Sequence, residues 1–160
     1  MFRSIRRRDR EVSEPDARQI LARAEYGVLA TVGEDGWPYA VPVNHVVEGD
    51  VVYLHCALVG HKLENIAHEA RVSYCAVASA QVLPSKLSTL YESAVVFGRA
   101  VRVSDPIEKE QALRRLATRF GSSAERIEQE LRTSGPQTAV VRIEIERITG
   151  KAHRAPPLAS

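Results

Sequence analysis

The stretch Tyr26–Ala57, with the sequence YGVLATVGEDGWPYAVPVNHVVEGDVVYLHCA, decides the fold. Val28, Ala30 and Val32 alternate with their neighbours, and this period of two is typical of a strand with one buried face. Turn sequences at residues 34–36 and 48–50, each containing Gly and acidic residues, divide the stretch into three apolar segments. The stretch therefore predicts an antiparallel meander with strands at residues 28–32, 39–47 and 51–57.

The rest of the chain adds helices around this meander and further strands. Ser13 followed by Pro15 and Asp16 is a helix-start signal, and Asp105-Pro106 and Ser123 begin two more helices by the same chemistry. The predicted helices cover about residues 14–25 and 61–69 and two segments beginning at 106 and 124. The further predicted strands are residues 72–78, 91–103 and 139–146, with an irregular segment at 79–88 and a possible bend or ligand contact at Gly98.

These elements predict the α+β class, with a small barrel of six antiparallel strands and short flanking helices. The 160 residues, 44% of them apolar, suit a single domain, which we assign to residues 1–150 with a loose tail at 151–160. No apolar run is long enough to span a membrane, and the N-terminus lacks the apolar core of a secretion signal. We therefore expect a cytoplasmic protein without a membrane partner.

Positive charge is concentrated in an N-terminal arm, residues 1–12, because five arginines lie within the first ten residues of a chain whose net charge is only +2. Such an arm could bind phosphate or nucleic acid, but a short basic terminus more often pairs with its own domain. We do not expect nucleic-acid binding.

The cysteine and histidine spacings do not indicate a metal site. Cys56 and Cys75 lie in apolar runs and lack Cys-x-x-Cys spacing, so reduced, buried thiols are the expectation, with a disulfide or a reactive thiol as the alternatives. His45, His68 and His153 have no partner at zinc-ligand spacing, which predicts no metal centre. One histidine suffices for a haem ligand, so haem remains an alternative.

The segment His55–Ile66, HCALVGHKLENI, is the strongest candidate for binding an anion. It places Gly60, His61 and Lys62 at a strand end and in the first turn of a helix, where free N–H groups and the helix dipole favour a phosphate. A tight turn with His61 and Lys62 on the surface is the equally simple alternative. His55 shares a strand face with Tyr53 and could project into a pocket, although a lone histidine is more often structural.

Two prolines in WPYAVPVN, residues 37–44, predict an irregular or unpaired stretch of strand whose backbone groups could face a ligand ring. Tyr39 and Asn44 are its polar candidates. No Ser-His-Asp order, paired carboxylates or Cys-His nucleophile is evident, so redox chemistry would need a borrowed cofactor.

The chain resembles the flavin-binding split-barrel proteins related to pyridoxamine phosphate oxidase, and within them the nitroimidazole-resistance (Nim-type) group. The resemblance spans residues 1 to about 104. It is carried by FRSIRRRDRE (2–11), YGVLATVGEDGWPYAVPVNHV (26–46), VVYLHCALVGHKLENI (51–66), VSYCAV (72–77) and YESAVVFGRA (91–100).

The resemblance implies a six-stranded split barrel that forms a homodimer with one FMN at each of two interface sites. It implies that Gly60, His61 and Lys62 hold the FMN phosphate and that His55, also the expected catalytic residue on the substrate side, lines the pocket with Cys56. The other implied flavin contacts are Val41, Pro42, Val43 and Asn44 beside the ring, and Tyr91 and Ser93 from the other subunit.

The resemblance favours a flavin-dependent reductase of small aromatic or nitro-aromatic compounds. The same fold includes deazaflavin and haem proteins, and a flavin-binding sensor without rapid turnover is the alternative from another class. The residues from Gly150 onward lack the substrate motif of the true pyridoxamine phosphate oxidases, so we do not expect that activity.

Overall fold

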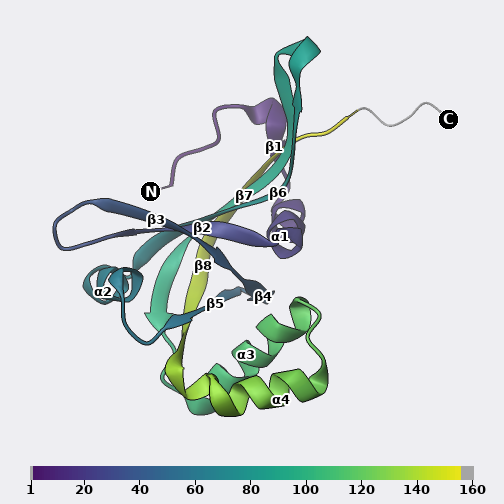
Figure 1. Cartoon of the computed structure of the whole chain (residues 1–160). Helices are drawn as coiled ribbons and strands as arrows, with labels where there is room; N and C mark the ends of the chain where they lie inside the picture. Colours follow the sequence, from purple (N-terminus) through teal and green to yellow (C-terminus); the bar gives the residue numbers. More distant parts are fainter. Residues whose placement is uncertain (1, 156–160) are drawn as a thin grey trace.

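The structure, a computed structural model, describes residues 2–155 (Figure 1). The strands are β1 (Glu11–Val12), β2 (Tyr26–Val32), β3 (Pro38–Asn44), β4 (Val46–Glu48), β5 (Val51–Ala57), β6 (Arg71–Leu83), β7 (Ser88–Arg102) and β8 (Thr138–His153). The helices are α1 (Glu14–Arg23), α2 (His61–His68), α3 (Pro106–Arg119) and α4 (Ala124–Thr133), with short 3-10 turns at Arg8–Arg10, Pro84–Lys86 and Gly135–Gln137. The α+β class and its antiparallel sheet are confirmed.

Three helices begin where the capping residues predicted. Ser13 accepts a hydrogen bond from the backbone N–H of Asp16 at 3.3 Å, and Ser123 accepts one from Arg126 at the same distance. The carboxylate of Asp105 accepts from the N–H of Ile107 at 3.1 Å. These contacts satisfy N–H groups that have no partner within the helix, which is why each helix starts at that residue.

The sheet curls until its two edge strands nearly meet. Its order is β3-β2-β6-β7-β8-β5-β4, so β3 and β4 lie at opposite edges, yet only His45 separates them in the sequence. A flat sheet of seven strands would hold these edges about 29 Å apart, whereas two successive Cα–Cα steps span at most about 7 Å. The sheet must therefore wrap into a barrel that stays open between its edges.

The buried side chain of His45 stabilises this junction by hydrogen bonds. It is fully buried, with Nε2 2.8 Å from the carbonyl oxygen of Leu21 and Nδ1 2.9 Å from the hydroxyl of Tyr74. The Tyr74 hydroxyl also lies 2.9 Å from the carbonyl of Val43. Because a carbonyl only accepts, Nε2 carries the proton, and the ring links α1, β3 and β6 at the point where the barrel closes.

The main core fills the inside of the curled sheet and is covered at one end by α1. Its fully buried members include Ile20 and Leu21 of α1 and Leu29, Tyr74 and Val96 of three neighbouring strands. A second, smaller cluster lies on the outer face of β5 and β8, where α3 packs; it contains Tyr53, Val103, Ala112 and Val140. The barrel wall thus has an inner face and a helix-covered outer face (Figure 1).

The strands differ from the sequence prediction in number and length. Eight strands replace the six predicted, because His45 divides the run 39–47 into β3 and β4 and because Glu11–Val12 pairs with β8. The segment 79–88, predicted to be irregular, instead forms most of a long hairpin of β6 and β7 that projects from the barrel (Figure 1). Alternation weakens there because both faces of the hairpin are exposed, which removes the pattern on which the prediction relied.

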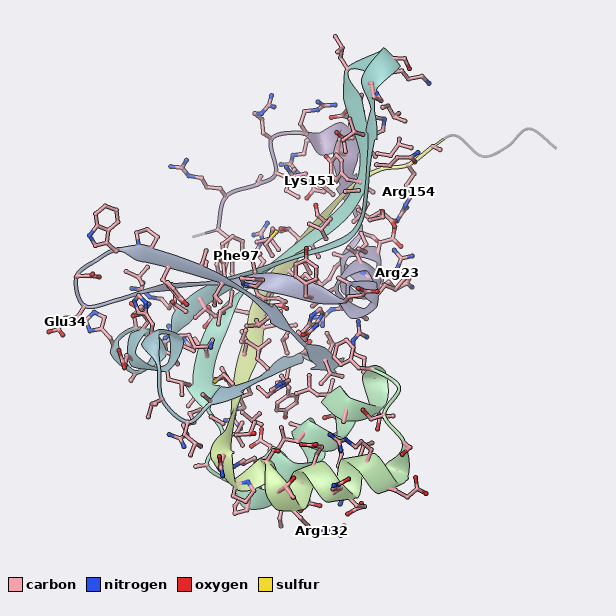
Figure 2. The ribbon with its side chains drawn as sticks, in the orientation of Figure 1. Arg23, Glu34, Phe97, Arg132, Lys151 and Arg154 are labelled. Atoms are coloured by element: carbon pink, nitrogen blue, oxygen red, sulfur yellow. The ribbon has the colours of Figure 1, made fainter. Side chains whose placement is uncertain are left out.

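The prediction of a loose tail from residue 151 is wrong for Lys151–His153, which continue β8 and pair with β7. Arg154 follows with an ion pair to Glu92 at 2.7 Å, and Arg23 of α1 pairs with the same carboxylate at 3.0 Å (Figure 2). Residues 156–160 of the predicted tail lie outside the described residues.

The basic arm is folded against the domain. Arg7 pairs with Asp9 at 2.6 Å and lowers the pKa of that carboxyl to about 2, while Phe2 lies against Phe97 with ring centroids 5.2 Å apart. The arm then enters the sheet through β1, beside Lys151.

Gly98 marks a close approach of two strands. A Cβ atom there would lie 2.1 Å from the carbonyl oxygen of Glu144 in β8, and the β7–β8 register shifts between Phe97 and Gly98. The bend predicted at this glycine is therefore a β-bulge, and the backbone of β8 takes the space that a side chain would need. In the part of the chain that the structure describes, no helix is both long and apolar enough to cross a bilayer.

Candidate flavin site at the split of the barrel

The open seam of the barrel, which we call the split, is bordered by two unpaired strand edges. β3 pairs only with β2, and β5 pairs with β8 along its whole length but with β4 only at Val51–Tyr53. The edge of residues 54–57 therefore faces β3 without a strand between them, and β3 and β5 lie in contact. Both edges present backbone N–H and C=O groups that a polar ring could bind.

The prolines of β3 suit this edge position. Pro38 and Pro42 are four residues apart, so both lose the N–H on the same side of the strand. A strand paired on both sides would lose ladder hydrogen bonds at each of them, whereas β3 tolerates them where its edge is free. The predicted irregular stretch in residues 37–44 is not found, because β3 pairs with β2 along its whole length; what is unpaired is its other edge.

The split leads directly to the N-terminus of α2. Gly60 precedes the helix with φ +138°, which residues with a Cβ rarely adopt, and a Cβ built there would meet no atom within 4 Å. The helix has no side-chain cap, since Gly60 is its N-cap residue. In the first turn, the N–H of Leu63 already bonds to the carbonyl of Gly60, whereas those of His61 and Lys62 have no partner within the helix, an arrangement that suits a phosphate.

Positive charge gathers beside these N–H groups. Lys62 makes no ion pair among residues 2–155, and it lies close enough to His55 and Cys56 for its charge to lower the pKa of both. Burial outweighs this charge at Cys56 and raises the pKa of the thiol overall, which keeps it protonated at neutral pH. Arg102 of β7 also acts on Cys56, and it is a second cation that the sequence did not single out.

Sequence reasoning missed Arg102 because only the order of the strands in the sheet brings this residue of β7 near Cys56 of β5. It lies 40 residues after Lys62 in the chain, and no motif joins the two. Its only sequence signal is a charged residue at the end of a strand, which also describes many solvent-facing arginines.

His55 and Cys56 do not line one pocket within the chain. Successive residues of a strand point to opposite faces, and Cys56 packs against the inner core while Tyr53, on the face of His55, belongs to the outer cluster. His55 thus lies on the outer face, which corrects the shared pocket that the resemblance implied. Cys56 and Cys75 form no disulfide, as expected, but both are half-buried and not buried as the sequence predicted.

The four candidates on β3 alternate in the same way. Val41 and Val43 pack against the inner core, whereas Pro42 and Asn44 are exposed. The Asn44 side chain donates to the carbonyl of Glu25 at 3.0 Å, so its amide fastens the end of β3 to the chain after α1. Only the backbone edge of these residues, together with Pro42, is free for a ligand.

Two contacts hold α2 at the split. The ring of His61 lies against that of Tyr39, with centroids 4.1 Å apart, which joins the first turn of α2 to β3. Asn65 is buried and donates to the hydroxyl of Thr31 at 2.9 Å, which fixes the helix on β2. His61 and Asn65 therefore position Gly60 and Lys62, the neighbours that can reach a phosphate.

Tyr91 and Ser93 lie far from the split of their own chain. Gly60 and Ala100 line one groove, and nine residues of strand separate Ala100 from Tyr91, a distance of about 30 Å. Ser93 pairs with Val77 and Lys151, near the base of the projecting hairpin. Within one chain, the structure does not bring Tyr91 and Ser93 to the flavin candidates.

No group of three or more His, Cys, Asp or Glu side chains within residues 2–155 is arranged to hold a metal ion. The site consists of backbone edges, a helix N-terminus, two cations and one imidazole. These features define a fold of the split-barrel type with a candidate site for an anionic ligand beside its open seam.

The chain belongs to the pyridoxamine 5'-phosphate oxidase family, since the sequence model of that family matches residues 13–152. The match covers every element of the site. No curated protein matches the chain.

Solved structures share the fold at low sequence identity. A conserved hypothetical protein from Mycobacterium tuberculosis superposes with a TM-score of 0.81 at 20% identity, covering 98% of this chain and 97% of that one. A candidate 5-nitroimidazole antibiotic resistance protein from Bacteroides thetaiotaomicron gives 0.71 at 22% identity, covering 88% and 85%. An FAD and haem binding protein from Mycobacterium smegmatis gives 0.72 at 20% identity, covering 94% and 77%.

Proposed function

We propose that the protein is an FMN-dependent oxidoreductase that reduces small aromatic or nitro-aromatic compounds. The observation that carries the proposal is the split itself: two free strand edges lead to an uncapped helix N-terminus with Lys62 beside it. A flavin mononucleotide has this same order of parts, a polar ring system followed by a chain that ends in a phosphate.

The residues present fit the cofactor. Lys62 and the first-turn N–H groups of α2 would hold the phosphate, and Gly60 leaves room for it because no Cβ occupies that space. The free edges of β3 and of residues 54–57 would bind the polar rim of the ring. Bound flavin would supply electron transfer from a nicotinamide donor to the aromatic acceptor.

His55 would contact the acceptor on the outer face. Burial, together with the charge of Lys62, lowers the pKa of His55, so its imidazole is neutral at pH 7. A neutral imidazole carries one N–H donor and one acceptor nitrogen, and it can therefore orient a polar substituent of either kind.

The proposal includes a homodimer, with Tyr91 and Ser93 of one subunit completing the site of the other. The β6–β7 hairpin exposes Val82 (69%) and Leu87 (97%) at a distance from the barrel. A two-stranded hairpin with apolar surface is marginally stable alone, so a second copy packed against it would stabilise it.

The test is the visible absorption spectrum of the purified protein before and after FMN is added, with its mass measured by light scattering. We expect a two-band flavin spectrum on a dimer, one FMN per chain, and oxidation of NADH or NADPH when a nitro-aromatic acceptor is supplied. If the dimer does not bind FMN but binds a deazaflavin, or shows a Soret band with haem, that cofactor would replace FMN in the proposal. A monomer that binds none of them would overturn it.

A further inference from the structure

A pocket of about 380 Å³ lies between the outer face of β5 and the pair of helices α3 and α4, which we call the helix pocket. Figure 1 shows the two helices below β5, on the side away from α1. Its walls are mainly apolar: they are formed by Leu113, Leu116, Ala117 and Phe120 of α3 and by Ile127 and Leu131 of α4. Ligand pockets of small molecules have volumes from about 300 Å³ upward and walls of this kind.

The charged groups at the edge of the helix pocket neutralise one another. Arg126 pairs with Glu130 at 2.5 Å, and the hydroxyl of Ser134 donates to the other oxygen of Glu130 at 2.7 Å. Thr138 donates its hydroxyl proton to the carbonyl of Ser134 at 2.8 Å. These groups need no further partner, so the pocket does not select a charged ligand.

His55 is the polar group of β5 that lines the helix pocket, and no residue from 2 to 155 forms a hydrogen bond with its ring. Its surface is accessible through the pocket, yet the surrounding protein lowers its pKa by desolvation. A neutral imidazole without a hydrogen-bond partner in the protein leaves one donor and one acceptor nitrogen available, and a ligand with a matching group could bind either of them.

Phe120 favours an aromatic ligand over an aliphatic one. The residue is 47% exposed although it belongs to the pocket wall, and the guanidinium of Arg119 lies 5.8 Å from its ring centroid. An aromatic ring packed edge-to-face or offset against Phe120 gains contact energy beyond the area that it buries.

We propose that the helix pocket binds a small, uncharged molecule of one or two aromatic rings, with its hydrogen-bonding substituent on His55. The role of this site rests on the proposed function. The bound aromatic ring would be the non-reacting part of the acceptor, and His55 would lie between that ring and the split. Binding itself needs no flavin and can be measured without it.

The experiment uses the full-length protein without flavin and 1-naphthol as the probe, a neutral two-ring phenol. Naphthol is titrated while the imidazole resonances of the five histidines are followed by NMR. We expect saturable binding that moves the His55 resonances most and lowers the pKa of His55 further, because the phenol proton binds the neutral ring. His55→Phe should weaken binding about fivefold through loss of that hydrogen bond.

Two variants fill the pocket from opposite walls, Ala117→Leu on α3 and Leu131→Phe on α4, and each should weaken binding at least tenfold. Thr118→Leu, which places the same leucine side chain at the exposed neighbouring position of α3, is the matched control and should bind naphthol normally. Circular dichroism of each variant shows whether it is folded. If one of the two filling variants does not fold, the other still tests the proposal.

The proposal is overturned if naphthol leaves the His55 resonances unchanged, or if it binds the two filling variants as well as it binds the control. It is also overturned if a second copy of the chain covers the helix pocket and naphthol competes with dimer formation. Failure of FMN to bind in the separate flavin titration would refute the proposed function while leaving naphthol binding intact.

Discussion

Replacing His45 with alanine tests whether this buried histidine closes the barrel. The substitution removes the hydrogen bond of Nε2 to the Leu21 carbonyl and the contact of Nδ1 with Tyr74, and it also removes the T-shaped contact of the two rings at 5.2 Å. The Leu21 carbonyl lies in the last turn of α1, where a helix leaves its C=O groups without internal partners. It would therefore be buried without a donor.

The expected cost has two parts. An unsatisfied buried carbonyl destabilises by about 1–3 kcal/mol, and the space of the lost ring adds a cavity term, so that His45→Ala should lower the free energy of unfolding by about 3–5 kcal/mol. This is a large fraction of the stability of a typical domain. His45→Phe retains the ring volume and should cost only the hydrogen-bond part.

The assay is urea unfolding followed by far-UV circular dichroism at one fixed protein concentration, because dimerisation would otherwise change the apparent stability. Trp37 is a poor probe, since its side chain is 75% exposed in the folded state. His68→Ala is the control, an exposed histidine whose loss should change stability by less than about 0.5 kcal/mol. The reasoning is refuted if His45→Phe is as stable as the wild type, because the two hydrogen bonds would then contribute nothing.

Three further outcomes follow from the site and its titrating groups. Burial lowers the pKa of His45 and His55 below the ordinary value of about 6.5, so the unfolded chain binds more protons than the folded chain in acid. The free energy of unfolding should therefore be highest above about pH 6.5 and fall as the pH drops through that value. A flat profile between pH 7 and pH 5 would contradict this. Lys62→Ala should weaken FMN binding by about 1.5–3 kcal/mol, or roughly 10- to 150-fold, through loss of a charge-assisted contact, whereas Lys86→Ala on the exposed hairpin turn should not; equal affinities in a fluorescence titration would locate the phosphate elsewhere. His55→Ala should retain FMN and lose turnover with the aromatic acceptor, and loss of FMN with an unchanged rate per bound flavin would remove His55 from the substrate side.

Local signals in the sequence were sufficient for the starts of the helices, for most of the strands and for the turn at the start of α2. Ser13, Asp105 and Ser123 begin helices because their side chains cap N–H groups within three residues, and that contact depends on nothing distant. The turn at Gly60 and Lys62 was evident for the same reason. The alternation in residues 26–57 placed the strands, although the buried face of β2 is that of Gly27, Leu29 and Thr31, opposite to the one that the sequence predicted.

Only the tertiary structure decided which elements meet. The exposed hairpin of β6 and β7 lacks a buried face, so its length could not be predicted from alternation, and the division of residues 39–47 at His45 depends on the closing of the sheet. The cation at Arg102 and the helix pocket around His55 arise where segments far apart in the sequence pack together. Capping and periodicity act over a few residues and are written in the sequence, whereas strand order and the helices that cover the outer face at His55 result from long-range packing.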